Sequence, residues 1–268
     1  MDEQELFDIV ASQIEESVAL IADRIQKLDE LGRGYVKPED IGKASITLFL
    51  VRSLGLWVRV LRFTANKIRL TDNDEHYFAL SNMRTLTDVF GRIIGLLEKD
   101  DDDVRAIMCI LYILYTASKL DDVAYQEWLK MYVDYPALQE VKVPATAKEC
   151  DWRWYKNSGY LFAGNNSVLT EEILKKYTVE TSKVFSNKST YEIFTHLSEA
   201  LHGNPMYHRQ AHNERFWLAS MSISLTANLI EVIDQKFLDR VRPRDFRVWL
   251  QGVDRFKKEL LQAWTGNN

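Results

Sequence analysis

Residues 191–212 read YEIFTHLSEALHGNPMYHRQAH, the pattern of one complete helix followed by a short loop. Ser189 and Glu192 have the Ser-x-x-Glu spacing of a capping box, which satisfies the first backbone N–H groups of a helix. Gly203 and Pro205 provide the stop, because glycine readily turns left-handed and proline cannot continue a helix. We expect a helix that begins after Ser189, ends near Gly203 and buries one apolar face.

Similar start and stop signals recur along the chain, and glycine (11) and proline (5) are too sparse among 268 residues for many β-turns. We predict an all-α, multi-helix bundle of about nine helices, with one irregular segment near residues 134–168. A helix is expected over about residues 170–185 and another after the acidic run 99–103. We expect a single helical domain over residues 1–268. The alternative is a subdivision into N-terminal helices (1–133), the irregular connection (134–168) and C-terminal helices (169–268).

Composition indicates a soluble globular protein, with 46% hydrophobic and 27% charged residues. With a net charge of −5, the protein as a whole does not attract nucleic acid, but a local basic patch that does so is compatible with the sequence. Cys109 and Cys150 cannot form a disulfide framework, and the N-terminus has no signal-peptide pattern, so we predict a cytoplasmic location. The apolar runs 46–61 and 107–117 are interrupted or too short to span a bilayer, so no membrane association is expected.

No common cofactor or metal motif is present: the chain lacks a Walker loop, a dinucleotide fingerprint, zinc-cysteine spacing and a Gly-x-Ser-x-Gly elbow. Glu199 and His202 form a Glu-x-x-His pair, but a di-iron bundle needs a second such pair, which the sequence does not contain. We therefore predict no metal and no cofactor. A simpler interpretation of His202 is a helix-end histidine that interacts with the helix dipole or a neighbour.

Two stretches of the sequence have features typical of nucleic-acid binding. The densest basic region is near the C-terminus, and its candidate nucleic-acid-binding residues are Arg240, Arg242, Arg244 and Arg247, partly neutralised by nearby acids. Residues 152–156, WRWYK, interleave aromatic and basic side chains, as in a base-stacking platform. The alternative interpretation of residues 152–156 is an amphipathic segment that caps the core.

A third pattern involves two predicted helices. Arg84 and Asp88 are four residues apart, and they precede a Phe-x-x-x-Ser-x-x-x-His sequence formed by Phe194, Ser198 and His202. This combination resembles a group of bacterial helical domains related to the HEPN superfamily. Members of that superfamily are all-helical and often dimeric. Many are metal-independent ribonucleases, or inactive relatives, that act in stress and phage defence.

The resemblance implies a role for each candidate catalytic residue. His202 would take the 2′-hydroxyl proton of RNA, and Arg84 would bind the scissile phosphate. Ser198 would orient the histidine or a phosphate oxygen, and Asp88 would fix the arginine. The sequence departs from active HEPN nucleases, which carry arginine and histidine a few residues apart on one helix. Activity here would require Arg84 and His202 to meet in space.

Three functions remain open from the sequence. The first is a HEPN-like ribonuclease or an inactive relative. The second is a non-catalytic module for protein interaction or oligomerisation, in which Arg84 bonds Asp88 and the last carbonyls of the His202 helix and so locks two helices together. The third is nucleic-acid binding through the C-terminal arginines. The candidate partners are RNA, a second copy of the chain or another protein.

Overall fold

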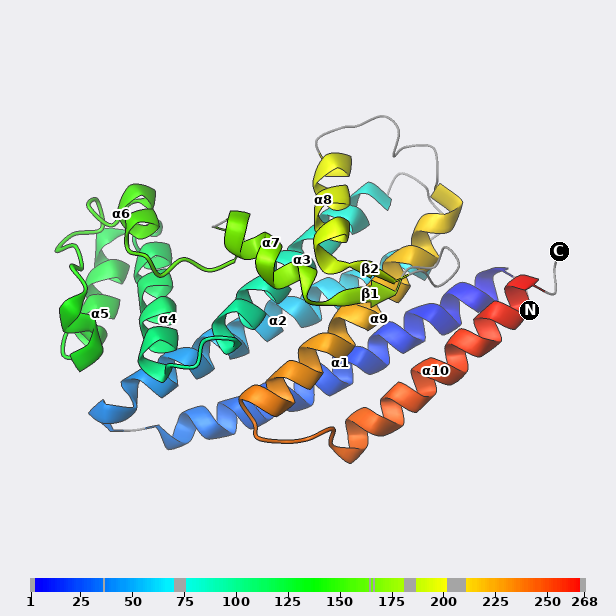
Figure 1. The fold of residues 1–268 in the computed structure, drawn as a ribbon, viewed down its shortest axis with the longest axis horizontal. Helices are drawn as coiled ribbons and strands as arrows, with labels where there is room; N and C mark the ends of the chain where they lie inside the picture. The colour runs from blue at the N-terminus through cyan, green and yellow to red at the C-terminus, as the bar shows by residue number, and fades with distance from the viewer. Residues whose placement is uncertain are drawn as a thin grey trace. The chain divides into compact units, whose positions relative to one another are not determined.

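The computed structural model describes residues 3–35, 37–69, 76–163, 165, 167–180, 187–201 and 211–265. These ranges are mainly helical (Figure 1), which confirms the predicted all-α class. The α-helices are α1 (Glu3–Gly34), α2 (Ile41–Arg69), α3 (His76–Leu97), α4 (Asp102–Ala117), α5 (Asp122–Tyr132), α6 (Trp152–Asn157), α7 (Ser167–Lys175), α8 (Thr190–Leu201), α9 (Ala211–Lys236) and α10 (Arg244–Thr265). Two short 3-10 helices, η1 (Pro38–Asp40) and η3 (Pro136–Glu140), complete the helical elements in those ranges.

The chain forms two compact units, each assembled from segments that are distant in the sequence. Unit 1 comprises Met1–Arg24, Leu54–Phe90 and Glu171–Asn268, and unit 2 comprises Ile25–Ser53 and Gly91–Thr170. Helices α1, α2, α3 and α7 each contribute residues to both units. The expected single domain and its contiguous subdivision remain predictions.

Local capping explains where several helices begin. The Asp101 carboxylate accepts hydrogen bonds from the backbone N–H groups of Asp103 (2.8 Å) and Val104 (3.3 Å), at the start of α4. The Asp121 carboxylate does the same for Ala124 (2.7 Å) at the start of α5. These caps satisfy backbone donors that have no partner inside the helix. They confirm that the acidic run 99–103 begins a helix.

The predicted capping box before α8 is also confirmed. The backbone N–H of Ser189 donates to the Glu192 carboxylate (2.8 Å), and the backbone N–H of Glu192 donates to the Ser189 hydroxyl (3.2 Å). Each side chain therefore satisfies a backbone donor near the other residue. Because α8 begins at Thr190, Phe194 and Ser198 lie one helical turn apart on it.

The helix predicted over about residues 170–185 is wrong beyond Lys175. There the chain forms strand β1 (Thr178–Glu180), which pairs antiparallel with strand β2 (Asn187–Ser189). The Tyr177 carbonyl accepts hydrogen bonds from both the N–H and the hydroxyl of Thr190 (2.8 Å each). Because a partner distant in the sequence takes a carbonyl that a longer helix would need, the extended conformation prevails over the local preference.

Residues 134–168, predicted to be irregular, contain η3 and α6, which have five and six residues. Side chains in this part of unit 2 form an aromatic core. The rings of Phe49 and Phe162 are stacked with their centroids 4.6 Å apart, and Tyr112 contacts both rings edge-on. In unit 1 the buried Trp57 indole donates to the Thr226 hydroxyl (3.1 Å), so its polar atom is satisfied inside the core.

Gly42, near the start of α2, is expected to be intolerant of any side chain. An added Cβ would lie 2.5 Å from Tyr135 Oη, and that hydroxyl donates to the Asp103 carboxylate (2.6 Å) and is not free to move away. We expect Gly42→Ala to lower the free energy of unfolding by about 1–3 kcal/mol, the usual cost of overpacking. Gly55→Ala on the same helix is the matched control. Among the described residues, apart from the neighbouring backbone of its own helix, nothing lies within 4 Å of its added Cβ, so it should stabilise the chain by about 0.5–1 kcal/mol. Urea denaturation followed by circular dichroism measures both effects, and equal midpoints for the two variants would contradict the expectation.

Candidate functional site

Helix α8 and the part of α3 that belongs to unit 1 carry the residues of the HEPN-like pattern. On α3, Arg84 and Asp88 are one turn apart, at the edge of a face that buries Met83, Leu86 and Phe90. On α8, Ile193 and Leu197 are buried, and Phe194 and Ser198 lie beside them. The apolar periodicity of each helix therefore places Arg84, Asp88 and Ser198 at the margin of the core.

The guanidinium of Arg84 connects the two helices. Its Nε donates a hydrogen bond to Ser198 Oγ (2.9 Å), and its Nη1 lies 2.5 Å from Asp88 Oδ1. The guanidinium carbon is 3.4 Å from the centroid of the Phe194 ring, a close cation–π contact. Four residues from two distant segments of the sequence thus meet at one cation.

The ion pair between Arg84 and Asp88 does not use the full capacity of the guanidinium. Nη1 is buried and has no aligned hydrogen-bond acceptor among the described residues, although the Asp88 carboxylate is close. The side chains of Arg84 and Asp88 keep 22% and 28% of their surface exposed. Because Nη1 itself is buried, an incoming anion cannot reach this nitrogen without displacing its neighbours.

Ser198 has one hydroxyl proton, and that proton is used within α8. The hydroxyl donates to the carbonyl of Phe194 (2.8 Å), which leaves an oxygen lone pair to accept from Arg84. This bond pattern makes Ser198 a positioning residue for the arginine. The predicted contact between Ser198 and a histidine or a phosphate oxygen stays a prediction.

The structure brings together Arg84, Asp88 and Ser198 among the four predicted catalytic residues, while His202 lies outside the described residues. The predicted structural alternative, in which Arg84 bonds the last carbonyls of the histidine-bearing helix, differs in detail from what is found. Arg84 contacts the Ser198 hydroxyl and the Phe194 ring, and no hydrogen bond in the described ranges joins it to a carbonyl of α8.

The four C-terminal arginines are in two different situations. Arg240 pairs with Asp245 (3.6 Å), and Arg242 pairs with Glu231 (2.7 Å). Arg244 and Arg247 are exposed in the first turn of α10. The ion pairs partly neutralise the basic region, so only part of it is available to a phosphate backbone.

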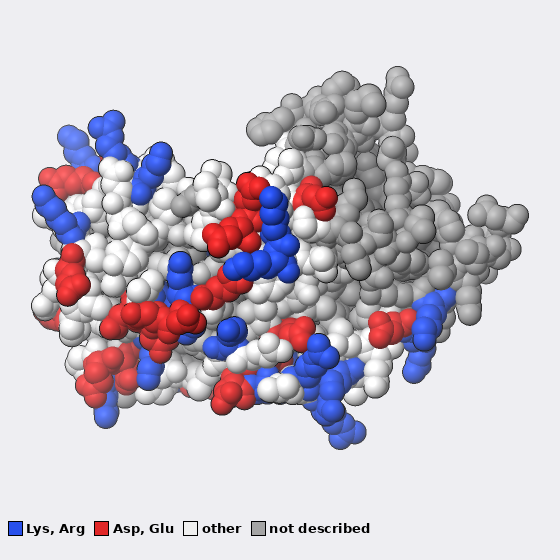
Figure 2. Space-filling view, viewed as in Figure 1, with Lys and Arg blue, Asp and Glu red and all other residues white. Residues whose placement is uncertain are grey.

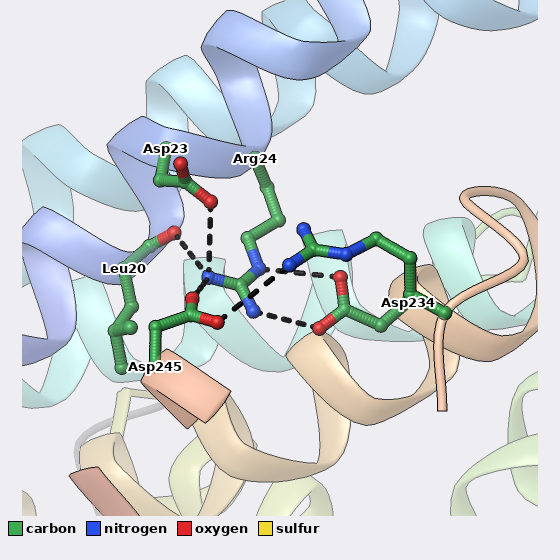
Figure 3. Close-up of polar contacts among 6 residues, drawn as sticks. Leu20, Asp23, Arg24, Asp234 and Asp245 are labelled. Atoms are coloured by element: carbon green, nitrogen blue, oxygen red, sulfur yellow. Dashed lines mark hydrogen bonds and ion pairs between the residues drawn. The ribbon is translucent and has the colours of Figure 1, made fainter. Parts of the chain in front are cut away.

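A second charged cluster in unit 1 is centred on Arg24 of α1, whose side chain is fully buried. Figure 3 shows its guanidinium between the carboxylates of Asp234, on α9, and Asp245, at the start of α10. The contact with Asp234 is bidentate, with Nε 3.3 Å and Nη2 2.7 Å from the two carboxylate oxygens. Nη1 bonds Asp245 and also lies 3.2 Å from Asp23. Arg24 has no exposed surface, so its guanidinium joins these helices and is not accessible to a ligand.

Sequence reasoning missed the Arg24 cluster, although α1 carried a signal for it. Ile14, Ser17, Ile21 and Leu28 share a buried face of α1, and Arg24 lies on the same face at helical spacing. A charged residue in an apolar stripe requires a buried partner of opposite charge. The sequence gives no indication of which acid supplies it, because Asp234 is 210 residues away.

The described residues also limit the chemistry available elsewhere. They contain no group of three or more His, Cys, Asp or Glu side chains able to hold a metal. Burial raises the pKa of the Cys109 thiol well above its usual value and that of Cys150 to about 11, so neither forms a ready nucleophile. One helix, Pro38–Arg69, is long and apolar enough to cross a membrane, and 56% of its most apolar window is buried. The core helix of a soluble protein passes the same test.

Comparison with known proteins gives no relative: no family model, curated protein or solved structure matches the chain. The fold and the clustered residues define a helical protein with an arginine held between two helices. The resemblance to the HEPN superfamily stays a prediction.

Proposed function

We propose that this chain is a HEPN-like helical protein that binds RNA at Arg84 and cleaves it without a metal, in a bacterial stress or defence system. The observation that supports the proposal is the meeting of Arg84, Asp88, Phe194 and Ser198 between α3 and α8. All four belong to the pattern that resembles the superfamily. Their contacts hold the guanidinium in one orientation, and 22% of the Arg84 side chain stays exposed, which supports binding of a phosphate at this arginine.

The proposed reaction assigns one task to each residue. His202, four residues after Ser198 in the sequence, takes the proton of the RNA 2′-hydroxyl. The 2′-oxygen then attacks the neighbouring phosphorus, the bond to the 5′-oxygen breaks, and that oxygen leaves with a proton returned by the histidine. Arg84 stabilises the charge that develops on the phosphate oxygens. Ser198 and Asp88 keep the guanidinium in place.

A non-catalytic interaction module is the second candidate. The observation in its favour is that Asp88 already opposes the charge of Arg84, and Ser198 and Phe194 complete its surroundings. In this function the same contacts join α3 to α8 and support a surface for another protein or a second copy of the chain. Binding through the C-terminal arginines is supported less, because Arg240 and Arg242 are engaged in ion pairs.

The test is cleavage of total RNA by the purified chain in excess EDTA, beside a His202→Ala variant of equal circular dichroism. We expect the parent to cleave and the variant to lose about 10²-fold or more of the rate, the typical contribution of a general base. Equal cleavage by both proteins would place any activity elsewhere. No cleavage by either would overturn the ribonuclease proposal in favour of the interaction module, for which a change of oligomeric state is the next measurement.

A further inference from the structure

The segment that interleaves aromatic and basic residues, 152–156, has a divided role in unit 2. Tyr155 is fully buried, and the Trp154 indole donates to the Lys142 carbonyl (2.9 Å), so these two side chains fasten α6 to the core and to the preceding connection. Trp152 is different, with 41% of its surface exposed. The interpretation of this segment as a cap on the core therefore applies to Trp154 and Tyr155, whereas Trp152 is available to contact a ligand.

Neighbouring rings hold Trp152 without covering it in a parallel stack. Its ring is 6.0 Å from Tyr115 and 5.9 Å from Tyr155, and both contacts are tilted by about 55°. Tyr115 and Tyr155 stack on each other at 4.9 Å, which makes a rigid support. An exposed indole that is fixed in orientation binds a flat base with little loss of conformational entropy.

Several cations lie close to Trp152 in the sequence or contact a ring that packs against it. Lys119 Nζ lies 4.9 Å from the centre of the Tyr115 ring, and Lys156 follows Trp152 by one helical turn. Lys148 and Arg153 are exposed nearby in the sequence. Figure 2 shows Lys and Arg side chains gathered around the region that α6 occupies in Figure 1. In the described ranges no carboxylate forms an ion pair with any of these four cations.

The acids in the same region are mostly engaged with backbone. The carboxylates of Asp121, Asp122 and Asp151 accept hydrogen bonds from the N–H groups of Ala124, Ala147 and Trp154. Glu149 is the one acid among residues 119–122 and 148–156 for which the structure gives no such bond. These bonds leave the carboxylates charged, but they orient three of the four acids toward the backbone, and none of the three forms an ion pair with the four cations among the described residues.

We propose that Trp152, with Lys119, Lys148, Arg153 and Lys156, forms a binding platform for single-stranded nucleic acid. One base stacks on the indole, and the cations contact the phosphates on either side. A duplex does not fit this chemistry, because its bases are already stacked and paired. All five residues belong to unit 2, whereas the Arg84 constellation belongs to unit 1, so the platform does not depend on the proposed reaction.

The test measures the fluorescence anisotropy of a labelled oligothymidine strand of about 12 nucleotides, within the length that one such surface engages. This DNA lacks a 2′-hydroxyl, so the proposed cleavage reaction cannot consume it. We expect Trp152→Ala to weaken binding about tenfold and Trp152→Phe to weaken it less, because phenylalanine still stacks. Met131→Ala, on the exposed side of α5, is the matched control and should bind like the parent.

Salt dependence tests the cations separately. Between about 50 and 200 mM salt, the slope of log Kd against log salt should fall by about 0.7 for each phosphate contact removed from a single strand. The triple variant Lys148→Gln, Arg153→Gln, Lys156→Gln should therefore show a clearly smaller slope than the parent. Unchanged binding by Trp152→Ala would overturn the platform. Equal affinity of the parent for a duplex or for polyglutamate would also overturn it, and would indicate a general surface for anions or acidic proteins.

Discussion

Replacing Arg24 with methionine is expected to lower the free energy of unfolding by about 3–5 kcal/mol, because the change leaves a buried carboxylate without its partner. The Arg24 side chain has no exposed surface and that of Asp234 has 1%. Burial alone would lower the pKa of the guanidinium, but the hydrogen bonds and charges of Asp234 and Asp245 raise it, so Arg24 stays charged. Methionine fills much of the volume and supplies none of the charge.

Two controls separate burial of charge from loss of packing. Arg33→Met changes an arginine on the same helix that is 78% exposed and pairs with Asp29, and it should cost about 0.5 kcal/mol or less. The double variant Arg24→Met, Asp234→Leu removes both buried charges, and it should regain most of the stability. If the double variant were as unstable as Arg24→Met, the lost free energy of unfolding would come from poorer packing and not from an unpaired buried charge.

Acid denaturation gives a second measurement on the same network. Burial tends to raise the pKa of Asp245, but its hydrogen bond and charge interaction with Arg24 outweigh that effect and lower the pKa. The stability that this carboxylate contributes is therefore present above its unfolded pKa and is lost as the pH falls through the lower folded pKa. Arg24→Met should make the stability below about pH 4 depend less steeply on pH than in the parent.

Arg84→Ala is expected to reduce RNA cleavage by about 10²–10³-fold, the usual effect of removing a donor that stabilises a developing oxyanion. The same change should lower the free energy of unfolding by only about 1–2 kcal/mol, because it removes one charged hydrogen bond, one ion pair and one cation–π contact at a partly exposed position. Arg84→Lys keeps the charge but cannot bond Ser198 and face Asp88 together. Its activity should therefore fall between that of the parent and that of Arg84→Ala.

Thr195→Ala on α8 is the matched control for Arg84→Ala. Thr195 is exposed and its hydroxyl donates to the carbonyl of Tyr191, one turn earlier on the same helix, so both cleavage and stability should stay close to the parent. A measurement of stability alone would not show whether Arg84 binds the phosphate of RNA or only joins α3 to α8. A large loss of cleavage with a small loss of stability supports the phosphate ligand, and a loss of stability with unchanged cleavage contradicts it.

Local chemistry explains which parts of this structure could be predicted from the sequence. The capping box of Ser189 and Glu192 and the cap by Asp101 involve residues within three positions of each other, so spacing alone reveals them. Arg84 and Asp88 are likewise one turn apart. The resemblance implied that Arg84 meets the helix that carries His202, but the bond from Arg84 to Ser198, 114 residues away, was not predicted.

Interactions between distant segments explain what the sequence did not reveal. The hairpin after α7 depends on Thr190 and Asn228, which hold the carbonyls of Tyr177 and Thr178 in an extended chain. Periodicity within residues 170–185 contains no trace of those partners. The Trp152 platform was visible as a pattern, but only the structure shows which of its aromatics is exposed.

Because the two units are interleaved in the sequence, they become complete at different times during synthesis. Unit 2 has all of its residues once position 170 has left the ribosome, whereas unit 1 must wait for α8, α9 and α10. Until then Arg24 lacks the carboxylates of Asp234 and Asp245, and Arg84 lacks the hydroxyl of Ser198. The α6 platform can therefore form on the nascent chain, while the Arg84 constellation is completed only in the finished protein, so a partly made chain carries the binding surface without the proposed catalytic site.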